Sequence, residues 1–376
     1  MKKVLFVATV AKGHIDVFHL PYLKMFKAMG WQTDVVAKNN YENQENCILP
    51  NCDNYYDVPF ERKPFKIKNL ESYFILKKII KKNKYDIIHC HTPVGGVLAR
   101  IAARHEHNTK VIYTAHGFHF FKGASLKNWI LFYPVEKLLS RKTDILVTMN
   151  SEDYSIAKKK FKMKKLYNVP GVGIELEKFN TIKDQQIINE LRTKNDVNIN
   201  DFVLIYVAEL SDRKNQEQLI LVAKKLIQKI PNLKVLIVGE GEKHRELLKI
   251  VTDSNLSQYV KLLGYRKDIS DLMSISNIVV STSKQEGLPV NIIEGLASGK
   301  PIVATNVRGN KDLVTQEVNG YLSPVNDIES MANNIFKING NSTLEKMLCE
   351  NSLKEAEKYG IDNVLKIFKD IYGLKE

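Results

Sequence analysis

The sequence has few cysteines and no long apolar run. Four cysteines, Cys47, Cys52, Cys90 and Cys349, are scattered over 376 residues, and no histidine or second cysteine pair completes a zinc pattern with the close couple. No stretch approaches the roughly 18 apolar residues that cross a bilayer. The apolar start ends at Lys12 without a small-residue cleavage pattern. We therefore expect reduced thiols and a cytoplasmic protein.

Acidic residues are scarce in the first half of the chain. Residues 1–180 carry 30 Lys+Arg against 16 Asp+Glu, whereas residues 181–376 carry 26 of each, so all of the net charge of +14 lies in the first half. A basic half attracts nucleic acid, anionic lipid headgroups or a phosphorylated substrate. A general lysine bias that keeps the protein soluble is the plain alternative, but it should affect both halves.

Apolar β-branched runs alternate with amphipathic stretches along the whole chain. Two consecutive series of strand and helix predict two doubly wound α/β domains. Helices are expected at 21–29, 70–82 and 126–140, the polar stretch 180–201 as the connection, and a helical tail from about 353. The predicted buried strands are 3–9, 33–38, 85–90, 110–116, 144–150 and 165–170, then 202–208, 234–240, 260–265, 277–283, 300–306 and 320–324.

Residues that follow the strands are the candidates for a site, because ligands of doubly wound sheets bind beyond the carboxyl ends of strands. Gly13 follows the first strand and could present backbone N–H groups to an anion, although no G-x-G-x-x-G is present. Gly239 and Gly241 form a lone G-x-G, which fits a tight turn or a ligand contact. His116 ends the strand 110–116 and could face a ligand or be a hydrogen-bonded packing residue.

Two glutamates flank the start of a predicted helix. Pro289 suits the first turn, and Gly299 with Pro301 ends the helix, which places it at about 289–298. Glu286 then lies before this helix and Glu294 within it. Both could simply be caps. As ligands, carboxylates accept paired hydrogen bonds from vicinal hydroxyls of a ribose or a hexose.

Two further groups complete the chemistry of this region. The N–H groups of Gly287 and Leu288 suit a phosphate or sugar oxygen at the helix start. Lys214, which follows another strand of the same half, supplies a cation for a diphosphate. A sugar nucleotide offers all of these partners at once.

From Ser283 onward the residues resemble a known family. The segment SKQEGLPVNIIEGLASGKPIVATNVRGN, followed by VNGYL, is similar to the signature of the family 4 retaining glycosyltransferases. VAKGH, DIIHCHTP, TAHGFHF, VGIELEKF, VAELSDRKN and IVGEG occur in the family's order, so the resemblance covers nearly the whole chain. It implies the GT-B fold, in which two Rossmann-like doubly wound domains face each other across a cleft. Residues 1–180 would bind the acceptor, with a C-terminal helix at about 356–376 packing back on them, and residues 196–355 would bind the donor.

The resemblance implies a role for each matching position. Glu286 would hold hydroxyls of the transferred hexose, Glu294 the ribose and Lys214 the diphosphate. His116 would lie beside the donor sugar, so His116, Glu286 and Lys214 are the expected catalytic residues. Gly13 would lie in the loop near the donor phosphate and the acceptor. The expected donor-binding residues are Gly13, Arg213, Lys214, Gly239, Arg266, Glu286, Gly287, Leu288 and Glu294.

One position departs from the family pattern. Many members have an arginine that binds the diphosphate where this chain has Glu209. Arg213 or Arg266 could supply the missing charge, although the motif fixes neither. The pattern VAELSDRKN resembles the branch that builds capsule, exopolysaccharide and lipid-linked oligosaccharides.

The branch implies the partners of the reaction. These are a nucleotide sugar, UDP-linked in this branch, and a lipid-linked saccharide such as an undecaprenyl-diphosphate sugar. We expect no metal and no cofactor, since no D-x-D motif is present and GT-B relatives generally do without a metal. The segments 65–84 and 126–142 mix apolar and basic residues, as helices at an anionic membrane surface do, although both could simply cover the sheet.

Two alternatives keep the fold or the charge but change the function. A sugar-nucleotide epimerase of the non-hydrolysing kind shares the GT-B architecture but lacks this pair of glutamates. A polyanion- or nucleic-acid-binding protein would explain the basic half. The basic residues show no interleaved aromatic platform, so we expect no nucleic-acid partner. The expected location is the cytoplasmic side of the plasma membrane, with peripheral attachment.

Overall fold

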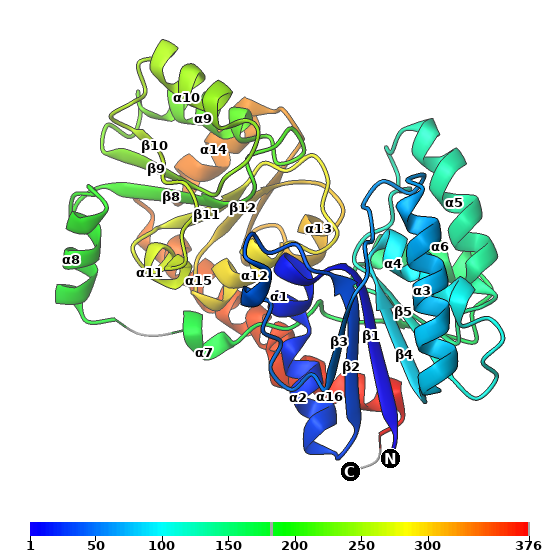
Figure 1. The fold of residues 1–376 in the computed structure, drawn as a ribbon. Helices are drawn as coiled ribbons and strands as arrows, with labels where there is room; N and C mark the ends of the chain where they lie inside the picture. Colours follow the sequence, from blue (N-terminus) through cyan, green and yellow to red (C-terminus); the bar gives the residue numbers. More distant parts are fainter. Residues whose placement is uncertain (181–182, 375–376) are drawn as a thin grey trace. The chain divides into compact units, whose positions relative to one another are not determined.

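The computed structural model describes residues 1–180 and 183–374 (Figure 1). The contacts divide the chain into two compact units. Unit 1 contains Met1–Gly173 and Ile361–Glu376, and unit 2 contains Ile174–Gly360. The chain thus leaves unit 1 at Gly173, seven residues before the boundary placed at 180 from the sequence, and returns to it for the last helix.

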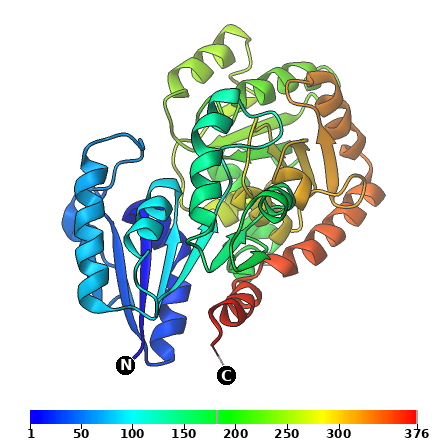
Figure 2. The same cartoon turned by 90° about the vertical axis from the view of Figure 1, so that its right-hand side faces the viewer.

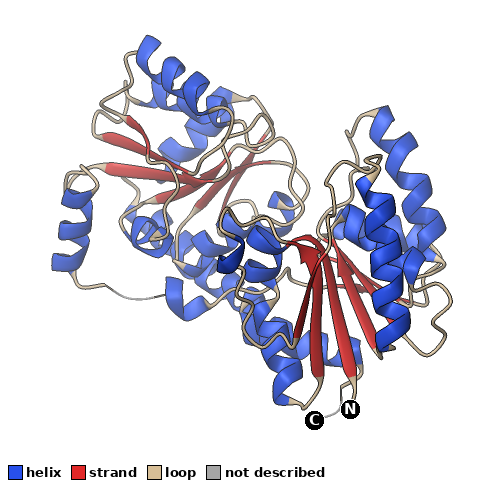
Figure 3. Ribbon diagram, in the orientation of Figure 1, coloured by secondary structure: helices blue, strands red, loops and turns tan. Residues whose placement is uncertain are grey.

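Unit 1 is built on a seven-stranded parallel sheet in the order β3-β2-β1-β4-β5-β6-β7. Its strands are coloured red in Figure 3. Its strands are β1 (Lys3–Val10), β2 (Gln32–Lys38), β3 (Asn54–Asp57), β4 (Ile87–His91), β5 (Lys110–Ala115), β6 (Ile145–Thr148) and β7 (Lys165–Asn168). Its helices are η1 (Ala11–Ile15), α1 (Asp16–Phe18), α2 (Leu20–Ala28), η2 (Gln44–Asn46), α3 (Lys68–Asn83), α4 (Pro93–Ala102), α5 (Leu126–Ser140), α6 (Ser151–Lys160) and α16 (Ile361–Tyr372).

Alternation along β1 separates the two faces of this sheet. Leu5 and Val7 point into a core that α3, α4, α5 and α6 cover. Phe6 points the other way, where its ring packs edge-on against Phe26 of α2 at 6.0 Å. Since both faces are covered, the strands are apolar almost throughout, as buried parallel strands are.

Unit 2 contains a six-stranded parallel sheet in the order β10-β9-β8-β11-β12-β13. This is the doubly wound order with one reversal, between β8 and β11. The strands are β8 (Phe202–Val207), β9 (Leu233–Val238), β10 (Val260–Leu262), β11 (Ile278–Ser281), β12 (Ile302–Thr305) and β13 (Gly320–Ser323). The helices are α7 (Leu176–Phe179), α8 (Gln185–Lys194), α9 (Gln216–Leu226), α10 (His244–Asp253), α11 (Ile269–Ser274), α12 (Val290–Ala297), α13 (Asn310–Leu313), α14 (Ile328–Ile338), α15 (Ser342–Ala356) and η3 (Glu357–Tyr359).

The structure confirms the two α/β series and adds elements that the pattern did not show. Strand β3 was not predicted, because its four residues, NYYD, are only partly buried at the edge of the sheet. The polar connection contains helix α8, whose Asp184 accepts a hydrogen bond from the N–H of Gln186 as its N-cap. Thr181 and Ile182 of the same stretch lie outside the described residues.

Helix α16, drawn in red in Figure 2, belongs to unit 1. Its side chains pack on the face of the sheet that carries Phe6. The buried Tyr372 hydroxyl forms a hydrogen bond of 2.6 Å with Nδ1 of His89 on β4. Nζ of Lys110, at the start of β5, donates to the carbonyl oxygen of Tyr372 at 2.6 Å. Phe368 packs edge-on against Tyr22 of α2 at 5.0 Å. The last helix is therefore part of the core of unit 1.

Replacing Tyr372 with phenylalanine should lower the free energy of unfolding by about 1–3 kcal/mol, because the buried Nδ1 of His89 then loses its partner. Urea unfolding followed by circular dichroism measures the change. Tyr265→Phe is the matched control, since Tyr265 is exposed. A loss at Tyr372 no larger than at Tyr265 would contradict this account of α16.

Candidate functional site

The polar residues predicted in the second half gather at one end of the sheet of unit 2. β8 and β11 are neighbours, and the strand order reverses between them. Lys214 lies in the loop after β8, and Glu286 lies in the loop after β11. The carboxyl ends of parallel strands share one edge, so these loops meet at the switch point of the sheet.

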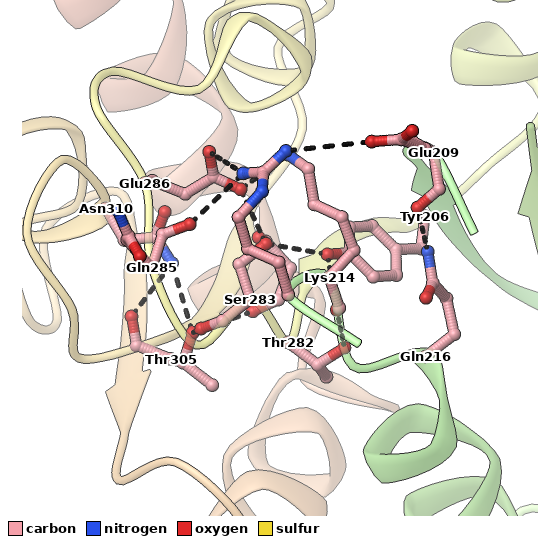
Figure 4. A network of polar contacts seen from close by, with 12 residues as sticks. Tyr206, Glu209, Lys214, Gln216, Thr282, Ser283, Gln285, Glu286, Thr305 and Asn310 are labelled. Carbon is pink, nitrogen blue, oxygen red and sulfur yellow. Dashed lines mark hydrogen bonds and ion pairs between the residues drawn. The ribbon is translucent and has the colours of Figure 1, made fainter. Parts of the chain in front are cut away.

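Glu286 is buried, with 6% of its surface exposed, and three side chains contact its carboxylate (Figure 4). Nζ of Lys214 lies 2.5 Å from one carboxylate oxygen, and Oγ of Ser283 donates to the same oxygen at 2.6 Å. Nη1 of Arg213 donates to the other oxygen at 3.3 Å. The two cations offset the cost of burying the carboxylate.

Hydroxyl groups next to Glu286 connect the loop after β8 with the loop after β11. The hydroxyl of Tyr206, on β8, lies 2.8 Å from Oγ of Ser283 and donates to the carbonyl oxygen of Lys214 at 2.8 Å. Oγ1 of Thr305, on β12, donates to the carbonyl oxygen of Ser283 at 2.5 Å. Burial, and then the nearby Glu286, raise the pKa of Tyr206 well above its usual value, so this phenol stays protonated.

Arg308 is a member of the site that the sequence reasoning missed. It lies after β12, is buried, and donates from Nε to the carbonyl oxygen of Glu286 at 2.9 Å. The next residue, Gly309, has φ of +82°, and a Cβ there would lie 2.6 Å from the carbonyl oxygen of Gly287. This close approach requires glycine and holds the loop after β12 against the loop after β11.

The start of α12 is shaped as the sequence predicted. Pro289 is its N-cap residue and Val290 its first residue. Among the described residues, none accepts a hydrogen bond from the N–H of Gly287 or Leu288. These two groups, together with the positive end of α12, are available to an anionic or hydroxyl ligand.

Glu294 lies in the second turn of α12 and is partly buried. No side chain among the described residues contacts its carboxylate closely enough for a hydrogen bond or an ion pair. Burial raises the pKa of Glu294 to about 7, and the positive charge of Lys178 opposes this effect only in part. The two glutamates thus differ in their surroundings. Glu286 is paired with two cations, whereas Glu294 has no such partner and has a pKa of about 7.

The remaining cations of the site differ in their pairing. Arg213 lies 4.0 Å from the Glu209 carboxylate and also contacts Glu286, so it is positioned beside Lys214. Arg266 is engaged by Asp268, to which it donates two hydrogen bonds of 2.7 and 2.5 Å. Of the two arginines considered for the missing charge, Arg213 is therefore the one that contacts the Glu286 cluster.

Gly239 has a packing role in the structure. Its φ is +137°, and a Cβ would lie 2.0 Å from the carbonyl oxygen of Ala208. At Gly241 a Cβ would lie 2.2 Å from the carbonyl oxygen of Leu210. Both glycines therefore let the loop after β9 pack against the loop after β8, which is the tight-turn interpretation. A ligand contact at Gly239 stays a prediction.

Two predicted residues, Gly13 and His116, lie in unit 1. Gly13 has φ of +81°, and its N–H donates to Asp16 at 2.7 Å. His116 follows β5, and its Nε2 lies 3.4 Å from Nδ1 of His91. Burial lowers the pKa of His116 to about 4, so its imidazole is neutral at physiological pH.

Two family models match the chain in succession. Residues 187–355 match Glycosyl transferases group 1, and residues 3–150 match Glycosyl transferase 4-like. Among residues 1–180 and 183–374, no helix combines the length and the apolar character that crossing a bilayer requires.

Similar proteins cover the chain almost completely. It is 41% identical over 377 residues to EpsD of Bacillus subtilis (strain 168), which is named as a glycosyltransferase, covering 99% of this chain and 96% of the relative. It is 33% identical over 314 residues to the UDP-Gal:alpha-D-GlcNAc-diphosphoundecaprenol alpha-1,3-galactosyltransferase of Escherichia coli, covering 81% and 80%. The fold is similar to that of Anabaena Alr3699/HepE in complex with UDP, with a TM-score of 0.80 at 21% identity over the full length of both chains. The chain belongs to the family 4 glycosyltransferases, which are transferase enzymes with the GT-B fold.

Glu294 should make stability fall as the pH rises from about 4.5 to about 7. In this window the folded protein keeps the proton that the unfolded chain has lost, so each added unit of pH favours unfolding. Above pH 7 both states are ionised and the effect levels off. Relative to Glu294→Gln, which carries no titrating group, the wild type should lose about 3 kcal/mol across the window.

Urea midpoints of both proteins between pH 4.5 and 8 measure this difference. Subtraction removes the contribution of every other titrating group. Parallel curves would show that Glu294 titrates normally.

Proposed function

We propose that this enzyme transfers a hexose or N-acetylhexosamine, with retention of configuration, from a UDP-sugar to a lipid-linked saccharide in the synthesis of a bacterial surface polysaccharide. The observation that carries the proposal is the cluster of Glu286, Lys214 and Arg213 at the switch point of unit 2. The names of relatives support the pathway. One acts on a diphosphoundecaprenol sugar with UDP-Gal, and one, CapM of Staphylococcus aureus, belongs to capsular polysaccharide biosynthesis. Family membership leaves the epimerase and polyanion-binding alternatives without support.

The donor would replace the internal ion pairs of the site. Its diphosphate would draw Lys214 and Arg213 away from Glu286, and the freed carboxylate would accept hydrogen bonds from the hexose hydroxyls. The N–H groups of Gly287 and Leu288 would bind oxygens of the diphosphate or the sugar. Every charged group that the donor meets would then exchange one partner for another, and none would be left unpaired.

Glu294 would bind the ribose. An ionised carboxylate can accept a hydrogen bond from each of the two vicinal hydroxyls, whereas a protonated one cannot accept both equally well. Because the pKa of Glu294 is about 7, two new hydrogen bonds would favour the ionised form and lower this pKa on binding.

The transfer itself would be driven by stabilisation of the leaving group. The bond from the anomeric carbon to the diphosphate oxygen breaks, the bond to the acceptor oxygen forms on the same face, and the acceptor proton goes to the departing diphosphate. Lys214, Arg213 and the start of α12 would stabilise the negative charge that develops there. The roles of His116 and Gly13 toward the donor and the acceptor stay predictions from the family resemblance. This scheme uses no metal.

The two glutamates should separate UDP binding from sugar binding. Wild-type protein should be stabilised by UDP, by about 2.7 kcal/mol at a hundredfold excess over the dissociation constant. One UDP-sugar should stabilise it further. Glu294→Ala should lose both effects, whereas Glu286→Gln should keep the UDP effect and lose the increment due to the sugar. Melting temperatures with UDP, UDP-glucose, UDP-galactose and their N-acetyl forms measure this.

Glu217→Ala is the matched control, because Glu217 is an exposed glutamate of unit 2 in the first turn of α9. It should behave as the wild type. Equal UDP shifts in the wild type and Glu294→Ala would refute the ribose assignment. Absence of a shift with every nucleotide would refute the donor site as a whole.

A lipid-linked acceptor requires a bilayer surface, and unit 1 offers one candidate for contact with it. Phe65 and Ile67, in the loop before α3, are 79% and 88% exposed, and Phe74 on α3 is also exposed. We call these residues, with Leu70, the α3 patch. Exposed basic residues lie in the same segment of the chain, at Arg62, Lys63, Lys66, Lys68, Lys78, Lys81 and Lys82.

Anionic lipid is the partner that fits this composition. Apolar side chains would enter the boundary of headgroups and acyl chains, and each basic residue near an anionic surface contributes about 1 kcal/mol. In α5 the aromatic residues Trp129, Phe132 and Tyr133 pack on the core of unit 1. This agrees with the alternative that the segment 126–142 simply covers the sheet. Leu126 and Ile130 of α5 are exposed.

Replacing Phe65, Ile67 and Phe74 together with serine should weaken binding to vesicles of anionic phospholipid by at least about tenfold, since each buried apolar side chain contributes about 1.5–3 kcal/mol. Vesicle co-sedimentation at low and high salt measures the effect. The double variant Ile199→Ser/Leu248→Ser removes exposed apolar residues of unit 2 and should bind as the wild type does. Unchanged binding of the triple variant would exclude the α3 patch as the contact.

A further inference from the structure

Four histidines of unit 1 converge at the carboxyl ends of three neighbouring strands. His14 lies in η1 directly after β1, and His19 lies just before α2. His91 is the last residue of β4, and His116 follows β5. β1 and β4 are neighbours at which the strand order of this sheet reverses, and β5 is the next strand. We call these four residues the histidine cluster.

The four histidines of the cluster each have a ring nitrogen close to those of the other three. One nitrogen from each histidine lies within 4.8 Å of one nitrogen from each of the others. Four nitrogens bound to a single zinc ion at about 2.0–2.1 Å would lie roughly 3.4 Å apart in a tetrahedron. Binding of one ion would therefore draw the most distant of these nitrogens together by up to about 1.4 Å.

Two of the rings are almost fully buried, and three of them have ring nitrogens without a hydrogen-bond partner among the described residues. His19 and His91 are only 2% and 1% exposed. Both ring nitrogens of His19, Nε2 of His91 and Nε2 of His14 have no hydrogen-bond partner among the described residues.

Buried histidines in unit 1 do not generally lack hydrogen-bond partners, as His89 shows. It lies two residues before His91 on the same face of β4, and its ring is equally buried. Its Nδ1 is bonded to Tyr372 at 2.6 Å and its Nε2 to Oγ1 of Thr114 at 2.8 Å. A buried polar atom without a partner costs about 1–3 kcal/mol, so several such atoms within one cluster of neighbouring rings indicate a ligand there.

We propose that His14, His19, His91 and His116 bind one zinc ion. Imidazole nitrogens suit zinc among the common divalent ions, and the absence of carboxylates from the set disfavours magnesium and calcium. Four protein ligands form a closed site, which is typical of structural zinc. The ion would tie the loop of residues 11–19 to the ends of β4 and β5. This inference goes beyond the proposed transfer reaction, in which no metal takes part.

The proposal predicts one tightly bound zinc per chain. Protein stripped with a chelator and then titrated with zinc chloride should bind one equivalent by calorimetry. Cobalt chloride should give the visible absorption bands of a tetrahedral cobalt site. His19→Gln and His91→Gln should each weaken zinc binding by at least about tenfold. His14→Gln and His116→Gln, at partly buried positions, provide the same test if a fully buried variant does not fold, and circular dichroism reports folding.

Two control variants separate this site from other zinc ligands. His105→Ala/His107→Ala removes two exposed histidines of unit 1, and Cys47→Ser/Cys52→Ser removes the close pair of free thiols. Both should bind zinc as the wild type does. Zinc should also slow tryptic cleavage after the exposed Lys12 in the wild type, because it fixes that loop.

Lack of stoichiometric zinc binding would overturn the proposal. So would binding that survives in folded variants of the cluster, or that disappears in the cysteine variant. Each readout is metal binding or proteolysis and not transfer. The zinc site and the donor site can therefore fail independently.

Discussion

Parallel pairing of the strands is the constraint on which both candidate sites depend. Every strand pair in the two sheets is parallel, so each connection crosses over a face and all carboxyl ends of a sheet lie along one edge. In unit 1 this edge gathers the histidine cluster. In unit 2 it gathers Lys214, Glu286 and Arg308, which come from the loops after three different strands. Residues that are far apart in the sequence thus become neighbours, and no local sequence motif predicts that they do.

In unit 2 the meeting of these loops also offsets the electrostatic cost of burying the Glu286 carboxylate. A buried carboxylate at Glu286 is costly unless cations and hydroxyl groups surround it, and Lys214, Arg213 and Ser283 do so. These contacts hold the side chains of the cluster in one arrangement in the bare site. Tyr206 and Thr305 add rigidity, because they bond the backbone of the loops and not the carboxylate. Such a preformed site loses little conformational entropy when a ligand binds.

The sequence predicted most of the fold and part of the site, and the difference has physical causes. Buried β-branched runs mark central strands, and Pro289 with Gly299 marks the ends of α12 closely. Strand β3 was not predicted, because a short edge strand has no continuous apolar run. Arg308 was not predicted, because it donates to a backbone carbonyl of another loop, and such a contact produces no recognisable residue spacing in the sequence. The histidine cluster was not predicted, because its members come from separate segments and match no zinc-binding spacing.

The return of the chain to unit 1 also bears on its synthesis. Unit 2 is one uninterrupted segment, whereas the core of unit 1 includes Phe368 and Tyr372 near the end of the chain. Domains fold as units while the ribosome works, so unit 2 can be complete before α16 has left the exit tunnel. Until then the faces of Tyr22 and Phe26 that α16 covers stay open to solvent and to chaperones. The half that is translated first is therefore the half that finishes folding last.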